Sequence, residues 1–540
     1  MNSVFEVFQA TAARRPDAPF LCVPARAQRD YCPEGAEFSY QWMLDQALAA
    51  ARAYTKAGYG HGHRIALLLE NRPEFFVQYL ALNSLGVAIV PMNPDYRHHE
   101  IVYQLDHADV VLAVGISNRV ADLEQASERC TLQPPAVDVA RLPDETLPSA
   151  GQPPPRATTA IDRETECAML YTSGTTGRPK GCLLTNDYFI TAGEWYLTLG
   201  GEAALLGDSD RVLNPLPLYH MNALAVTATS MMIGGGCLIS PDRFHPKSWW
   251  NDVVSTRATV IHYLGVVPPL LMNLPASDAE SNHSVRFGVG AGIDPDHHAA
   301  SETRFGFPMV EVWGMTETGR IFADNHPPRQ VGTRAFGRPM SGLEARVVDE
   351  HDQDVAVGTP GELLVRHSAA DPRRGFFSAY HKNEPATAEA WYGGWFHTGD
   401  TVRQDEKGTL YFIDRNKNII RRSGENIAAG EIEAALQAHT AVAQAAVIGV
   451  PDDLREEEEV FACIVVMPDV DSDETTARAL FDWCMQRLAY YKAPGYVLFR
   501  ESLPTTGTQK VQKTLIFDPD TDPTTEPGCI DLRNAKRRGN

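Results

Sequence analysis

The 540-residue sequence lacks the features that mark several classes of protein. It contains no apolar run of the roughly 18 residues needed to cross a bilayer, so no transmembrane segment is expected. Its nine cysteines include no CxxC pair and no Cys/His spacing of a zinc site. That pattern excludes a disulfide scaffold and suits a reducing compartment. There is also no internal repeat.

Positive charge is scarce, with 48 Lys and Arg against 69 Asp and Glu and a net charge of −21. This balance argues against nucleic acid as a partner, and anionic ligands would need locally placed basic groups. The opening stretch carries Glu6 and stops at Pro16, which predicts an amphipathic helix rather than a signal peptide. An organelle presequence is the alternative, and we expect a cytoplasmic protein whose oligomeric state the sequence leaves open.

The length implies at least two domains. Apolar runs at 64–70, 86–93 and 110–115 alternate with a helix-period segment at 74–85. Such continuous apolar strands between helices predict an α/β fold with parallel sheets covered by helices.

A domain boundary is expected near residue 417, because a short strand-like run and a helix at 430–439 follow it. We predict a large domain over 1–417, a small mobile α+β domain over 418–517 and a polar tail over 518–540. The acidic run at 456–459 is interpreted as a solvated turn before a strand, and the final basic residues as a solvated tail.

A glycine-rich loop follows the apolar strand at 167–171. Glycines let backbone N–H groups curl around an anion, and hydroxyls and Lys180 add donors and charge, so the loop predicts a phosphate cradle. Pro179 separates it from the Walker A pattern, and a flexible surface loop is the alternative. The loop residues are Thr172, Ser173, Gly174, Thr175, Thr176 and Gly177.

"YTSGTTGRPKG" (171–181) resembles the signature loop of the adenylate-forming superfamily, which includes acyl-CoA synthetases, luciferases and peptide synthetase adenylation domains. Further motifs follow in the family's order, and the resemblance extends from about residue 35 to about 517. The motif sequences "GMTETG" and "RSGENI" are most similar to those of the crotonobetaine/carnitine-CoA ligase branch. The other motifs are "LPLYH" (216–220), "VGAGIDPD" (289–296), "EVWGMTETG" (311–319), "GWFHTGD" (394–400), "DRNKNIIRRSGENI" (414–427), "LAYYKAP" (488–494) and "LPTTGTQKVQK" (503–513).

The resemblance implies a nucleotide site for ATP. In it Trp313 would flank the adenine, with a core tryptophan as the alternative, and Thr316 would bind the α-phosphate. Glu317 would bind Mg²⁺, with a surface salt bridge as the alternative. Asp400 and Arg415 would bind the ribose. The remaining implied nucleotide-site residues are Gly290, Ala291, Gly292, Gly314 and Met315.

Lys510 is the catalytic lysine by resemblance, bridging the acyl carboxylate and the α-phosphate. The family's glycine before it is Gln509 here, which leaves Lys513 as a rival. Lys417 falls at the hinge position, and Gly424 would line the tunnel for the pantetheine arm of coenzyme A. Arg421 and Arg422 are candidates for binding its phosphates, or a solvated basic turn.

The acyl pocket is expected beneath four segments: 219–223, 263–266, 290–292 and 314–322. Tyr219, His220 and Tyr263 would line it, which suits a medium-sized or aromatic acid. Arg320 would bind a second carboxylate, or turn outward to an acidic neighbour.

The whole pattern predicts an AMP-forming acid–CoA ligase. The alternatives are an enzyme that adenylates an acid for a carrier protein or an amine, one that oxidises its adenylate as luciferase does, and an inactive nucleotide- or acyl-binding homologue. No carrier domain follows residue 520, which favours coenzyme A as the acceptor.

Overall fold

The computed structural model describes residues 1–142, 146–151, 160–172, 179–265, 267–293, 295–415, 419–422, 425–452, 457–504, 511, 513, 516–518 and 521–536. The chain divides into two compact units, and residues from Arg415 onward form most of the second. Among the helices that the structure describes, none is both long and apolar enough to cross a membrane.

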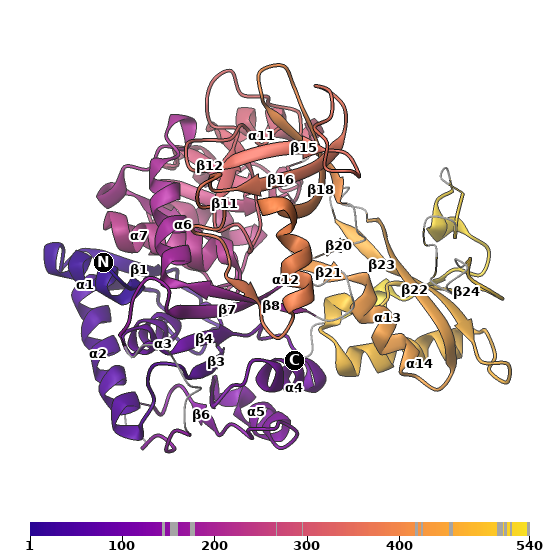
Figure 1. Ribbon diagram of the computed structural model, residues 1–540, viewed down its shortest axis with the longest axis horizontal. Helices are drawn as coiled ribbons and strands as arrows, with labels where there is room; N and C mark the ends of the chain where they lie inside the picture. Colours follow the sequence, from indigo (N-terminus) through magenta and orange to yellow (C-terminus); the bar gives the residue numbers. More distant parts are fainter. Residues whose placement is uncertain are drawn as a thin grey trace. The chain divides into compact units, whose positions relative to one another are not determined.

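Two large sheets form the base of the first unit (Figure 1). In sheet order, the eight-stranded sheet contains β14 (Ile321–Ala323), β13 (Met309–Gly314), β12 (Phe287–Ala291), β11 (Val260–Leu264), β9 (Arg211–Leu213), β10 (Cys237–Ile239), β1 (Pro19–Val23) and β2 (Ala36–Ser39). The seven-stranded sheet contains β17 (Ala379–Tyr380), β8 (Lys180–Thr185), β7 (Glu166–Thr172), β4 (Ala88–Pro91), β3 (Arg64–Leu68), β5 (Leu112–Gly115) and β6 (Ala136–Asp138).

The middle of each large sheet is parallel, and its strands are buried apolar runs. Strand β3 pairs in parallel with β4 and β5, with Ile65 opposite both Ile89 and Leu112, and all three side chains are fully buried. Strands buried on both faces require continuous apolar sequence. For this reason the apolar runs at 64–70, 86–93 and 110–115 predicted β3, β4 and β5. The predicted α/β fold with helix-covered parallel sheets is confirmed.

A third, four-stranded sheet completes the first unit, and helices pack around the three sheets. The third sheet contains β15 (Glu344–Val348), β16 (Gly361–Arg366), β18 (Phe396–Gln404) and β19 (Leu410–Arg415). The helices before residue 415 are α1 (Val4–Arg14), α2 (Tyr40–Ala57), α3 (Pro73–Asn83), α4 (His98–His107), α5 (Val120–Ser127), α6 (Asn186–Thr198), the π-helix Asn222–Ala228, α7 (Thr229–Gly234), α8 (Trp249–Ser255), α9 (Val267–Met272), α10 (Asp278–Ser281), α11 (Pro295–Phe305) and α12 (Glu384–Ala390).

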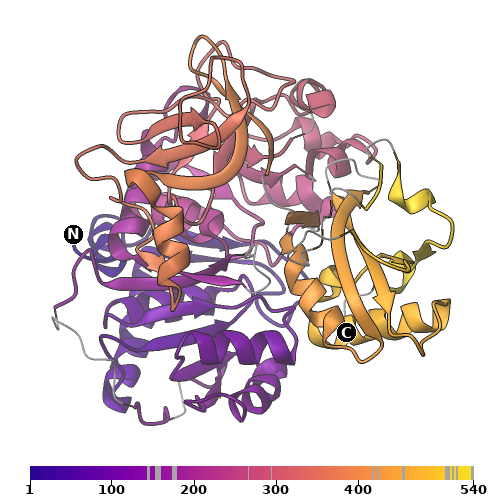
Figure 2. The ribbon, with the colours of Figure 1, turned by 45° about the vertical axis from the view of Figure 1, so that its right-hand side comes forward.

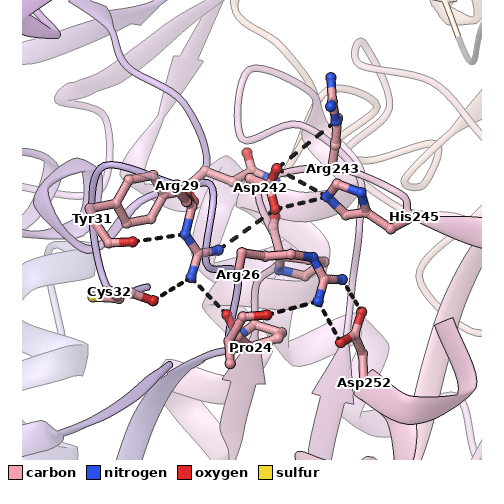
Figure 3. A network of polar contacts seen from close by, with 12 residues as sticks. Pro24, Arg26, Arg29, Tyr31, Cys32, Asp242, Arg243, His245 and Asp252 are labelled. Carbon is pink, nitrogen blue, oxygen red and sulfur yellow. Dashed lines mark hydrogen bonds and ion pairs between the residues drawn. The ribbon is translucent and has the colours of Figure 1, made fainter. Parts of the chain in front are cut away.

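The loop between β1 and β2 is held by two arginines (Figure 3). Arg29 donates to the carbonyls of Pro24 at 2.7 Å and Cys32 at 2.8 Å, and it lies 3.6 Å from Asp242. Arg26 forms an ion pair with Asp252 of α8. These contacts join the connection to the segment after β10, the neighbour of β1, and to α8, and its backbone carbonyls find side-chain donors.

The second unit has a four-stranded sheet with one layer of helices (Figure 2). Ile432 and Leu436 of α13 (Ala429–Gln437) are both buried in the core on one face of this sheet, as their spacing predicts. Its strands in sheet order are β22 (Val442–Pro451), β23 (Glu458–Val466), β24 (Tyr496–Phe499) and β25 (Ile530–Asp531), beside the hairpin β20 (Ile419–Arg422) and β21 (Glu425–Ala428). Its helices are α13 (Ala429–Gln437) and α14 (Glu474–Arg487).

Two expectations for the second unit are wrong. The acidic run was interpreted as a solvated turn, but β23 begins at Glu458 and the side chain of Glu459 is fully buried. The segment after 517 was interpreted as a polar tail, but β25 pairs with β24 and the side chain of Lys536 is 4% exposed. Glu459 and Lys536 are partners of each other and stand 77 residues apart in the chain. Because neither has its partner nearby in the sequence, both were expected to be solvated.

Candidate active site

The glycine turn after β12 is held by a buried carboxylate. Gly292, with a φ of +83°, donates its N–H to Glu311 Oε1 at 2.5 Å, and Ile293 donates to Oε2 at 3.2 Å. Glu311 lies on the neighbouring strand β13, where it is opposite Gly290. The predicted adenine turn, with Gly290, Ala291 and Gly292, is therefore fixed by a side chain of the next motif.

Gly290 itself is required by a close approach. A Cβ atom there would lie 2.3 Å from the ring of Tyr263 on β11. Tyr263 is fully buried and donates its hydroxyl to the carbonyl of Val310 at 3.3 Å. Its ring thus supports the turn from inside the sheet, and the predicted contact of Tyr263 with an acyl group stays a prediction.

Trp313 and Asp400, the residues predicted for the adenine and the ribose, are in direct contact. The Trp313 indole donates to Asp400 Oδ2 at 2.8 Å, although the two residues stand 87 positions apart. Both side chains are buried, and the Trp313 ring also packs against Phe322 and Phe336. The structure therefore joins the carboxyl end of β13 to the middle of β18.

The turn after β13 carries Thr316 and Glu317 between Gly314 and Gly319. Tyr188 of α6 donates its hydroxyl to the carbonyl of Thr316 at 2.7 Å, and the Thr318 hydroxyl bridges the carbonyls of Met315 and Arg320. Because these backbone groups are all satisfied, the turn has one defined shape.

Glu317 is a buried carboxylate, 4% exposed, with a neutral donor beside it. Tyr380 of β17 donates its hydroxyl to Glu317 Oε1 at 2.8 Å. The Glu317 backbone carbonyl accepts from the N–H of Phe377 at 2.9 Å. The side chain is therefore oriented by a residue 63 positions away, which excludes the surface salt bridge considered for it.

Tyr219 and His220 precede a π-helical turn that a buried polar chain fixes. Asn222 Oδ1 accepts from Asn214 at 2.9 Å and lies 2.9 Å from His262 Nδ1. His262 Nε2 lies 2.8 Å from the hydroxyl of Tyr196. Burial lowers the pKa of His262 to about 3, so the ring is neutral, accepting from Tyr196 and donating to Asn222. The segment that carries His220 is thereby anchored to β11 and α6.

Arg320 is buried, and the expectation that it turns outward to an acidic neighbour is wrong. Its guanidinium donates to the carbonyls of Gly342 and Arg374 and lies 5.2 Å from the ring centroid of Phe376. It forms no ion pair within the part of the chain that the structure describes. Burial lowers its pKa to about 10. Its contacts join the turn to the segments before β15 and after β16, and binding of a second carboxylate stays a prediction.

Several predicted residues lie outside the described ones: Ser173, Gly174, Thr175, Thr176, Gly177, Lys417, Gly424 and Lys510. Thr172 ends β7, Lys180 begins β8 and Arg415 ends β19.

Two basic side chains considered in the sequence are already paired. Lys513 lies 2.6 Å from Glu433 and donates to the carbonyl of Val447, and Arg422 pairs with Asp452 and Glu459. Both groups therefore have partners in this structure, and their roles with a substrate stay predictions.

Sequence reasoning missed Glu311, Tyr188 and Tyr380. Glu311 lies inside the motif at 311–319. Its position two residues before Trp313 on a strand places both side chains on the same face of the sheet, and this spacing was the one sequence signal for its role. The two tyrosines lie outside every motif and reach the site from α6 and β17, so nothing local in the sequence marks them.

Comparison with known proteins assigns the chain to a family. The model described as AMP-binding enzyme matches residues 8–370, and the one described as AMP-binding enzyme C-terminal domain matches residues 431–510. The sulfoacetate–CoA ligase of Cupriavidus necator is 32% identical over 520 residues, covering 94% of this chain and 96% of that protein. The crotonobetaine/carnitine–CoA ligase of Proteus mirabilis is 29% identical over 493 residues, covering 88% and 92%.

Among solved structures, the o-succinylbenzoate CoA synthetase of Bacillus subtilis superposes with a TM-score of 0.80 at 23% identity, covering 97% of this chain and 99% of that one. The fold is thus that of the acyl-CoA synthetases, a class of adenylate-forming enzyme. The chain belongs to the AMP-binding enzyme family. The predicted family, and with it the predicted class of AMP-forming enzyme, is confirmed.

Burial of Glu311 predicts a pH effect on stability. Burial raises its pKa to about 7, against about 4.3 in an unfolded chain, although Gly292, Ile293, His298 and Arg334 favour the ionised form. Between these values the folded protein binds more protons, so stability falls as pH rises through about 7. Glutamine does not titrate, so the thermal midpoint of Glu311→Gln relative to the wild type should increase from about pH 5 to about pH 8.

Scanning calorimetry at several pH values measures this difference, and Glu406→Gln, at an exposed carboxyl, controls for the loss of one charge. A midpoint difference that stays constant with pH would contradict the buried, protonating Glu311.

Proposed function

We propose that the protein is an ATP-dependent acid–CoA ligase. A carboxylate oxygen bonds to the α-phosphorus of ATP, and pyrophosphate leaves with the electrons of the broken bond. The sulfur of coenzyme A then bonds to the carbonyl carbon of the acyl-adenylate, and AMP leaves. The family membership and the names of the similar ligases support this reaction.

The observation that carries the proposal is the contact between Trp313 and Asp400. An adenine and its ribose are joined by one bond, so residues that recognise both must lie together. The carboxylate of Asp400 is an acceptor of the kind that ribose hydroxyls require. Thr316 and Glu317 follow Trp313 in the next turn, which suits a phosphate chain extending from the nucleoside.

Glu317 fits a magnesium ion held jointly with nucleotide phosphates. Among the described residues no group of three His, Cys, Asp or Glu side chains could hold a metal ion. A hard cation shared with ATP needs only one or two carboxylates, because phosphates and waters supply the rest. When bound, the ion would neutralise phosphate charge. Tyr380 would keep Glu317 Oε1 in a fixed direction, and Thr316 would donate its hydroxyl to the α-phosphate.

We propose a medium-sized or aromatic carboxylic acid as the substrate, with a dicarboxylate as one form. The small residues Gly290, Ala291 and Gly292 leave room beside the turn, and Tyr219 and His220 are adjacent aromatic rings, 4.6 Å apart. Sulfoacetate and crotonobetaine, named for the similar ligases, each add a second charged group to a carboxylate, so both belong in the test.

The function is tested by pyrophosphate release from ATP across a panel of acids, with and without coenzyme A. The panel contains sulfoacetate, crotonobetaine, short aliphatic acids, and aryl mono- and dicarboxylates. We expect release with one acid class and a thioester only when coenzyme A is present. Adenylate that is never transferred to coenzyme A would favour loading of a carrier protein or an amine. An absence of release with every acid would contradict the proposal.

The catalytic lysine is tested by a matched pair of variants. Lys510→Ala should lower acyl-adenylate formation about a hundredfold, because it removes the charge that stabilises the transition state. Lys513→Ala should stay within about threefold of the wild type, because its ammonium is occupied by Glu433. Single-turnover assays without coenzyme A measure both, and the reverse order would move the assignment to Lys513.

Tyr380→Phe tests the orientation of Glu317. Loss of a group that orients a metal ligand costs about tenfold or more in metal affinity, so the magnesium concentration giving half-maximal adenylation should rise by that factor. The affinity for ATP without metal, measured by calorimetry, should not change. An unchanged magnesium requirement would remove the role of Tyr380.

A further inference from the structure

Strand β18 carries a bulge that includes Asp400. In the antiparallel pairing of β16 with β18, the register shifts between Glu362 and Leu364, where one residue of β16 stands against three of β18. The third of these three is Asp400, which is 1% exposed. A bulge of this kind changes the direction in which a side chain points. The conformation of the bulge therefore decides where the Asp400 carboxylate lies.

Two side chains satisfy the backbone groups of this bulge. Glu362 Oε1 accepts from the N–H of Gly399 at 2.9 Å. The Thr398 hydroxyl donates to the carbonyl of Leu363 at 2.7 Å and accepts from the N–H of Asp400 at 3.1 Å. Gly399 has a φ of +69°, which glycine adopts without strain, and a Cβ atom there would meet no described residue within 4 Å beyond its chain neighbours. Glycine is thus required by the backbone conformation rather than by space, and Glu362 holds that conformation.

The second oxygen of Glu362 is held by a histidine of the same bulged strand. His397 Nδ1 lies 3.3 Å from Glu362 Oε2, and this hydrogen bond raises the pKa of His397 above its usual value. Both side chains are partly exposed, so Glu362 can keep its charge, and a protonated histidine beside it favours the ionised form. An ionised carboxylate makes a stronger hydrogen bond to the N–H of Gly399 than a neutral acceptor would.

The glycine turn after β12 is held by the same kind of contact. Glu311 of β13 accepts from the N–H of Gly292, whose φ is +83°. Strand β13 also carries Trp313, which donates to Asp400. Each side of that buried contact therefore has a glutamate nearby that fixes a glycine of positive φ.

We propose that Glu362 is a positioning residue for the ribose of ATP, acting through Gly399 on Asp400. This inference rests on the proposed function, in which the Asp400 carboxylate accepts from ribose hydroxyls. Without Glu362, the N–H of Gly399 loses its acceptor and the bulge takes other conformations. The Asp400 carboxylate then cannot satisfy Trp313 and the ribose together, because hydrogen bonds weaken steeply away from their preferred geometry.

The test compares two nucleotides bound to the full-length enzyme, measured by calorimetry with magnesium and without an acid. They are ATP and its dideoxy analogue, which lacks both ribose hydroxyls, so the ratio of their dissociation constants reports the ribose contacts. The wild type should favour ATP about thirtyfold, the size of hydrogen bonds to a charged acceptor. In Glu362→Ala the preference should fall to about threefold or less. Glu362→Gln keeps an oxygen acceptor for Gly399 and should stay within about twofold of the wild-type ratio.

Glu344→Ala is the matched control, because Glu344 of β15 pairs with Arg366 of β16 at 2.7 Å in the same sheet, away from the bulge. Its ratio should equal that of the wild type. Gly399→Ala tests the bulge itself. The added methyl group meets open space but disfavours the φ of +69°, so the preference for ATP should fall as it does in Glu362→Ala.

Hydrogen exchange on the same variants needs no nucleotide. The amide of Gly399 should exchange about tenfold faster in Glu362→Ala and at the wild-type rate in Glu344→Ala, because local opening of the bulge follows the loss of its acceptor. A wild-type ratio in Glu362→Ala, or an equal loss of affinity for both nucleotides, would overturn the inference, as would unchanged exchange at Gly399. A wild type that binds both nucleotides equally refutes the ribose contact of the proposed function instead, and the exchange result then decides whether Glu362 holds the bulge.

Discussion

The hydrogen bond from Trp313 to Asp400 is the contact on which the candidate site depends. It joins β13 of the eight-stranded sheet to β18 of the four-stranded sheet, and both partners are buried. An indole N–H has no other role than donor, and a buried carboxylate without a donor is costly. The pair therefore holds the two sheets together at this point. The turn with Thr316 and Glu317 directly follows β13, so its position depends on where this contact holds the strand.

The turn that carries Thr316 and Glu317 is held by two tyrosine hydroxyls from distant parts of the chain. Tyr188 satisfies the carbonyl of Thr316, and Tyr380 orients the carboxylate of Glu317. Neither tyrosine is near an ionisation that would change its role, because burial raises the pKa of each well above its usual range. Neutral donors of this kind fix a functional carboxylate without cancelling its charge, which keeps it available for a cation.

Most of the architecture was predictable from the sequence, because parallel strands buried on both faces need unbroken apolar runs. The run at 64–70 gave β3, and the helix-period segment at 74–85 gave α3. Motif order then indicated the family and grouped Trp313, Thr316 and Glu317 in one motif. Prediction failed where charges were judged by their neighbours in the chain. Glu459 and Lys536 each looked solvated, and Arg320 looked like a surface arginine, because the groups that bury them are distant in sequence.

The sequence by itself determined the class of fold, the family and the local order of the nucleotide motifs, since these depend on periodicity and on residues within a few positions of one another. Only the tertiary structure decided which side chains act on those motifs. Glu311 clamps the glycine turn, Tyr380 aims Glu317, and Lys536 meets Glu459. The physical reason is that a buried polar group needs a hydrogen-bond partner close to it in space, and the fold can supply that partner from a residue distant in the sequence.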